Sequence, residues 1–154
     1  MTRVKPSKPS NLAVAAQGLS LAGLLWPGRR RWRLPAAATA GATAVMAAGA
    51  ALGVAGARAQ GRHLTPHVEP LPDAPLLTTG PYRVSRNPVY AGVLAGAAGF
   101  AVLRRRVEPL VALAALAATL HVKTGMEEQA LRARFGAEYD TYSARTPRLL
   151  GLPR

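Results

Sequence analysis

The fifteen residues from Thr78 to Gly92, TTGPYRVSRNPVYAG, concentrate side chains that can grip a ligand. They include two tyrosines, two arginines and two prolines, whereas most of the chain is rich in alanine, leucine, valine and glycine. Arginine binds carboxylates and phosphates through several N–H donors, and tyrosine adds an aromatic face and a hydroxyl. An adjacent acidic pair, Glu127 and Glu128, follows later. Two short segments therefore hold cationic, aromatic and acidic groups.

Each of these residue types also has a structural explanation. The arginines of the stretch can anchor a helix end at lipid headgroups, and Tyr82 and Tyr90 can belong to an interfacial aromatic belt. Glu128 can pair with Arg132, one helical turn further on. A functional interpretation therefore depends on the whole set and its order, and on the elements that position it.

Four apolar blocks dominate the rest of the chain. As α-helices with a rise of 1.5 Å per residue, these blocks have lengths of roughly 22 to 35 Å, whereas the bilayer core is about 30 Å thick. Only the second spans that core comfortably, and the third and fourth are better explained as a tight helical hairpin or as helices extended by polar turns. We expect an all-α integral membrane bundle with about four transmembrane segments, at residues 11–27, 35–57, 88–103 and 108–122.

The remaining segments connect and extend these helices within one domain, residues 1–154. Residues 58–87 are rich in proline and glycine without helical periodicity, which predicts a long loop. Such a loop in a compact protein is usually functional or disordered. No proline interrupts the fourth helix before Pro147, so it continues past its apolar part and ends at Gly136. A short helix follows, and residues 123–154 form a C-terminal cytoplasmic segment.

Composition excludes several classes of function. The formal net charge is +13, but the arginines stand at the edges of apolar blocks without interleaved aromatic residues, which favours anionic lipid headgroups over nucleic acid. There is no cysteine, which rules out thiolate metal sites and cysteine nucleophiles. His63 and His67 have the spacing of a helical metal pair, yet Pro66 separates them in a loop, so we predict no metal site.

Three motifs resemble the isoprenylcysteine carboxyl methyltransferase and phospholipid methyltransferase superfamily of membrane enzymes: LTP at 64–66, LTTGPYRVSRNPVYAG at 77–92, and EEQALRARFGAEYDTYSARTPR at 127–148. The resemblance covers roughly the C-terminal 90 residues. It implies a small helical bundle that binds S-adenosylmethionine between the two motif segments. A lipophilic substrate, a small molecule or a lipid, would enter from the bilayer.

Carried over by position, the resemblance implies particular site residues. The catalytic candidates are Arg86, Asn87 and Tyr90. The cofactor-binding candidates are Tyr82, Arg83, Asn87, Pro88, Tyr90, Glu127 and Glu128, with Tyr139, Tyr142 and Arg145 as weaker ones near the pocket. At Asn87 the family usually has histidine; an amide can still donate a hydrogen bond but cannot carry a proton at neutral pH.

The physical chemistry of this cofactor suits those residue types. S-adenosylmethionine carries a carboxylate, an ammonium, a sulfonium and an adenine, which call for a cation, an acid and an aromatic or apolar wall. The resemblance therefore implies methyl transfer to a lipophilic acceptor such as an isoprenylcysteine carboxylate or a lipid. A small-thiol methyltransferase, a phospholipid-amine methyltransferase and a non-catalytic membrane protein with the same fold remain alternatives.

Charge and targeting signals bear on orientation. With the termini and the long loop on one side, that side holds thirteen lysines and arginines and the other seven. This predicts an inner-membrane protein whose active site faces the cytoplasm, although the seven are concentrated in two short loops. An alternative is an export signal made of RRRWRL, residues 35–57 and Ala57-Arg58-Ala59. Its apolar core is longer than usual and two more apolar blocks follow, so we expect an uncleaved anchor.

Overall fold

The computed structural model describes residues 7–151, which form helices and turns and contain no strand. The all-α prediction is therefore confirmed for this part of the chain. The α-helices are α1 (Lys8–Leu24), α2 (Ala36–Gln60), α3 (Pro88–Arg104), α4 (Val107–Phe135) and α5 (Ala137–Arg145), and the 3₁₀ turns are η1 (Gly61–His63) and η2 (Gly80–Arg83).

Local signals explain most of the helix ends. Ser7 caps α1, because its hydroxyl accepts a hydrogen bond from the N–H of Ser10. Pro88 occupies the first position of α3, where its missing N–H costs nothing. Gly136, with φ near +53°, separates α4 from α5 as its position in the sequence suggests. Arg105, with φ near +57°, makes the tight turn between α3 and α4.

Some boundaries differ from the sequence expectation. Helix α1 begins at Lys8 and ends at Leu24, three residues before the apolar block 11–27 does. The segment 58–87 is also more ordered than a featureless loop, because α2 continues to Gln60 and two 3₁₀ turns follow. One of these turns is GPYR itself, so the motif has a defined backbone.

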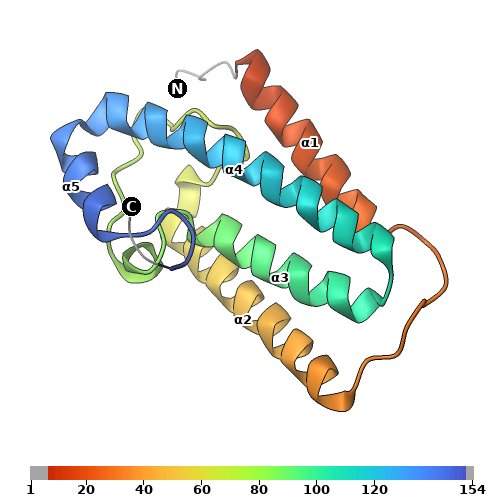
Figure 1. The fold of residues 1–154 in the computed structure, drawn as a ribbon. Coiled ribbons are helices and arrows are strands. Elements are labelled where there is room, and N and C mark those ends of the chain that lie inside the picture. The colour runs from red at the N-terminus through yellow and green to blue at the C-terminus, as the bar shows by residue number, and fades with distance from the viewer. Residues whose placement is uncertain (1–6, 152–154) are drawn as a thin grey trace.

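The helices pack in pairs. Helix α2 lies along α3, α1 lies along α4, and α3 also contacts α4 (Figure 1). The close approach of α2 to α3 depends on glycine, since a Cβ at Gly92 would collide with the backbone of Gly53 and Gly49. The segment 61–87 and α5 lie at one end of the bundle, and the α1–α2 connection and the α3–α4 turn lie at the other.

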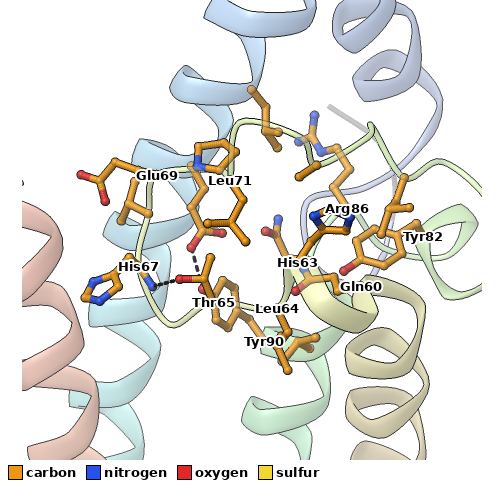
Figure 2. A pocket seen from close by; sticks show the side chains of 18 of the residues that line it. Gln60, His63, Leu64, Thr65, His67, Glu69, Leu71, Tyr82, Arg86 and Tyr90 are labelled. Carbon is orange, nitrogen blue, oxygen red and sulfur yellow. Dashed lines mark hydrogen bonds between the residues drawn. The ribbon is translucent and has the colours of Figure 1, made fainter. Parts of the chain in front are cut away.

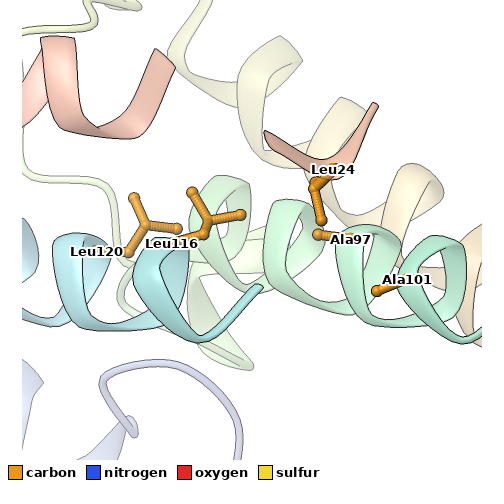
Figure 3. Packing of buried hydrophobic residues seen from close by; sticks show 5 residues of the cluster. All are labelled: Leu24, Ala97, Ala101, Leu116 and Leu120. Carbon is orange, nitrogen blue, oxygen red and sulfur yellow. The ribbon is translucent and has the colours of Figure 1, made fainter. Parts of the chain in front are cut away.

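The buried apolar core is small and lies where α1, α3 and α4 meet. It consists of Leu24, Ala97, Ala101, Leu116 and Leu120 (Figure 3). Many large apolar side chains point outward instead, among them Val54 on α2 and Val111 on α4. Outward-facing apolar side chains suit a helix in contact with lipid rather than water.

Two helical segments are long and apolar enough to cross a membrane: Ala36–His63, which is α2 with η1, and α4. Helix α3 is apolar but shorter. These helices support membrane association, whereas the number of four transmembrane segments stays a prediction.

Candidate functional site

A cavity of about 480 Å³ lies at the end of the bundle that carries the long loop. The ends of α2, α3 and α4 form its walls, and residues 63–77 run across it as a roof (Figure 2). The predicted site residues that line it are Tyr82, Arg86, Asn87, Tyr90 and Glu127, with Tyr142 from the weaker group. Residues of two motifs, such as Tyr90 and Glu127, which are 37 positions apart in the sequence, thus share one cavity.

A hydrogen bond joins the two motifs directly. The hydroxyl of Tyr90, in the first turn of α3, donates to Oε1 of Glu127 on α4 over 2.6 Å. The ammonium of Lys123 lies 5.0 Å from the centre of the Tyr90 ring, close enough for a cation–π interaction. The cavity wall therefore holds an aromatic ring, a carboxylate and a cation in contact.

Glu128 does not line the cavity and has a different environment. Its carboxylate lies 3.1 Å from Nη2 of Arg86 and 2.6 Å from Nη2 of Arg148, and it is 4% exposed. The hydrogen bond to Glu128 raises the pKa of Arg148. Arg132, the alternative partner, binds Asp140 instead. Because the side chains of adjacent residues on a helix point about 100° apart, the two glutamates face different surroundings.

Asn87 uses its amide to hold the C-terminal segment. Its Nδ2 donates to the carbonyl of Arg148 over 2.9 Å, and Ser85 Oγ donates to the same oxygen. One residue earlier in each segment, the N–H of Arg86 donates to the carbonyl of Pro147 over 2.9 Å. Hydrogen bonds thus hold residues 147–148, which follow α5, against residues 85–87.

Three of the motif tyrosines, Tyr82, Tyr139 and Tyr142, are buried. Burial raises the pKa of Tyr82 to about 12 and that of Tyr139 to about 12, so both phenols are neutral at physiological pH. The hydroxyl of Tyr142 donates to the carbonyl of Tyr82 over 2.7 Å, which ties α5 to η2. The Tyr139 ring packs edge-on against Tyr142 and does not line the cavity.

Five predicted residues do not line the cavity: Glu128 and Tyr139, described above, together with Arg83, Pro88 and Arg145. Arg83 and Arg145 are exposed on the surface. Pro88 is buried as the first residue of α3, so it positions the helix but is not among the residues that line the cavity.

The sequence did not single out the groups that hold the roof. The ammonium of Lys123, 1% exposed, donates to Oε1 of Gln17 over 2.9 Å and to the carbonyl of Pro66 over 2.6 Å. The buried N–H of Val68 donates to Ser10 Oγ over 3.0 Å. Helix α1 is therefore part of the site. The available signal was the position of Lys123 directly after the apolar block 108–122, because a charge that is buried there needs partners.

A comparison with family models gives the decisive observation. The model for phospholipid methyltransferase matches residues 37–138, about two thirds of the chain. The chain belongs to the phospholipid methyltransferase family. Comparison with curated proteins gives no match.

The matched range of this phospholipid methyltransferase family member contains most of the residues that line the cavity, from α2 through the roof to α4; Gln17 and Tyr142 lie outside it. The family resemblance noted from the sequence motifs is thereby confirmed. The family points to methyltransferase activity on lipid-like substrates and, with the two long apolar helices, to membrane association.

Proposed function

We propose that this protein transfers a methyl group from S-adenosylmethionine to a lipophilic acceptor at the membrane. The observation that carries the proposal is the hydrogen bond between Tyr90 and Glu127 on the wall of the cavity. It brings the two motif segments together around a space of about 480 Å³, within the range of small-molecule sites.

The residues around the cavity fit the cofactor's groups. Arg86 lines the cavity and its buried Nε has no hydrogen-bond partner among the described residues, so a donor is free for a carboxylate. Glu127 offers a negative charge to an ammonium or sulfonium group. Tyr82 and Tyr90 supply aromatic surface for adenine or for the sulfonium. When bound, the cofactor supplies a methyl group that already has a good leaving group.

The protein's contribution is then to bind, align and exclude water. Arg86 and Glu127, placed on α3's entry and on α4, fix the two charged ends of the ligand. Alignment of acceptor, methyl carbon and sulfur in a line can supply up to about 7 to 11 kcal/mol. The roof over the cavity limits access of water, which strengthens the charge interactions inside it.

The acceptor is lipophilic, because the roof carries leucine and proline side chains, such as Leu64, Leu71 and Leu76, into the cavity lining. A carboxylate acceptor needs no general base, whereas a lipid ammonium must first lose a proton. Asn87 cannot take that proton, and its amide already binds Arg148. We therefore favour an acceptor that is already ionised. We also propose that the protein has four membrane segments and that its active site faces the cytoplasm.

The test is methyl transfer from radiolabelled S-adenosylmethionine into a total lipid extract and a small-molecule pool, with the product identified by mass spectrometry. We expect label in a lipophilic product that is lost with a Tyr90→Phe, Glu127→Gln double variant. Cofactor binding without transfer into either pool would favour a non-catalytic membrane protein. Label only in a water-soluble thiol would replace the proposed acceptor class.

A further inference from the structure

The end of the bundle away from the cavity carries a dense positive charge. It consists of the α1–α2 connection, residues 25–35, and the α3–α4 turn, residues 104–108, which we call the arginine end. Glu108 is its one acidic residue. Its arginines are Arg29, Arg30, Arg31, Arg33, Arg104, Arg105 and Arg106.

Some of these arginines build the arginine end itself. Arg106 is 1% exposed and donates to the carbonyl of Trp26. Arg104 donates to the same oxygen over 2.8 Å, and the N–H of Arg31 donates to the carbonyl of Arg105 over 2.9 Å. These bonds fasten the two connections to each other, so the surface they form has a defined shape.

The other arginines are available to a ligand. Arg29, Arg30 and Arg33 are exposed, and they make no hydrogen bond or ion pair within residues 7–151. Arg31 pairs with Glu108 over 2.6 Å and uses the only acidic group nearby. Six of the seven guanidinium groups therefore have no carboxylate partner among residues 7–151, and Arg29, Arg30 and Arg33 are the exposed ones among them.

An open groove of about 630 Å³ leads to this charge along the side of the bundle. It runs between α1 and α4, with walls that include Leu19, Val111 and Ala115. Trp26 and Arg31 also line it, so one part of the groove is apolar and another meets the arginine end. The volume of the groove lies in the range of small-ligand sites. Its apolar part matches the apolar chain of an amphiphilic ligand, and its charged end matches the headgroup.

We propose that the arginine end and the adjoining groove bind an anionic phospholipid. The phosphate contacts the free guanidinium groups, which suit phosphate through their planar set of N–H donors, and an acyl chain lies in the groove. A zwitterionic lipid carries its own cation and leaves the three arginines uncompensated, so charge complementarity selects the anionic class. This site lies at the opposite end of α3 from the cavity, about 25 Å away, and is separate from the methyl transfer proposed above.

The chain carries its own probe for this site. Its two tryptophans, Trp26 and Trp32, both belong to the arginine end. In a Trp32→Phe background, fluorescence comes from Trp26 alone, which lines the groove. The full-length protein is placed in detergent micelles with phosphatidylglycerol or phosphatidylcholine that carry the same brominated acyl chains, because bromine quenches tryptophan on contact.

We expect phosphatidylglycerol to quench Trp26 at a several-fold lower mole fraction than phosphatidylcholine. Arg29→Gln, Arg30→Gln and Arg33→Gln together should abolish that difference, and Ala115→Phe, which fills the groove, should reduce quenching by both lipids. The matched control removes three charges at the other end, with Lys8→Gln, Arg58→Gln and Arg62→Gln, and should keep the preference.

Equal quenching of the parent by the two lipids would overturn the proposal. Loss of the preference to the same degree in the control variant would also overturn it, since the effect would then reflect net charge rather than a site. A helical circular dichroism signal equal to that of the parent shows that a variant is folded. None of these measurements depends on methyl transfer.

Discussion

Adjacent residues with the same side chain have different surroundings in this protein. Glu127 faces the cavity and accepts a hydrogen bond from Tyr90, whereas Glu128 lies between two arginines. Helical neighbours point about 100° apart, so the sequence indicates that only one of the pair can face a given pocket. It did not indicate which one, because Arg86 and Arg148 are distant in sequence and reach Glu128 only through the tertiary fold.

Glu128→Gln should destabilise the protein without acting directly on the cavity. The change removes the negative charge from a site where Arg86 is 7% exposed, and breaking a buried ion pair on one side costs about 3 to 5 kcal/mol. Thermal unfolding in detergent measures it. Glu138→Gln, at an exposed position on α5, is the matched control and should leave the unfolding temperature unchanged. An unchanged temperature for both variants would contradict this role of Glu128.

Variants at position 87 test whether the histidine that the family usually has there acts through hydrogen bonding. Asn87→His should be tolerated, because a ring N–H can donate to the Arg148 carbonyl as the amide does. Asn87→Ala loses that bond and should weaken cofactor binding by about 0.5 to 3 kcal/mol, with Asn87→Leu worse. Equilibrium binding of radiolabelled S-adenosylmethionine is the measurement. If the Ala and Leu variants bind as the parent does, residue 87 has no part in the site.

At the scale of elements, local sequence signals predicted some of the helix boundaries, whereas the contacts between distant segments could not be predicted. Gly136 marks the end of α4 and Pro88 the start of α3, and both were visible in the sequence. The order within residues 58–87 was not predictable, because its bonds go to distant partners such as Ser10 and Lys123. The contribution of α1 to the site was missed for the same reason.

The roof should loosen when its bond to α1 is removed. Ser10→Ala leaves the buried N–H of Val68 without a partner, which costs about 1 to 3 kcal/mol of local stability. Limited proteolysis with thermolysin should then cut within residues 63–77 several-fold faster. Thr43→Ala, which removes only a bond within α2, is the control. Equal cleavage rates in the two variants would show that the bond does not hold the roof.

At the scale of the whole molecule, the described structure separates two ends of the bundle, one with the cavity and one with the clustered arginines. By sequence, thirteen of the twenty lysines and arginines belong to the segments on the side of the termini and the long loop, so the charge rule favours the cytoplasm for that side. A cytosolic supply of cofactor requires the same orientation. The helix directions were predictable from the apolar blocks, but their pairing across α2 and α3 depended on contacts such as Gly92 with Gly53.

Reporter fusions test this orientation. A fusion at Arg154 should be active when the reporter requires the cytoplasm, and a fusion within the α1–α2 connection should be active when the reporter requires the outer side. The two positions serve as controls for each other. A fusion at Arg154 that is active only on the outer side would reverse the proposed orientation.

The central claim is that the cavity beside Tyr90 and Glu127 binds S-adenosylmethionine, and equilibrium binding of the radiolabelled cofactor to purified protein in detergent tests it most directly. Glu127→Gln keeps the shape of the side chain and removes its charge, so we predict a loss of about 2 kcal/mol or more in binding free energy. Glu138→Gln should bind as the parent does. Unchanged binding by Glu127→Gln, with unchanged thermal unfolding, would contradict the proposed site.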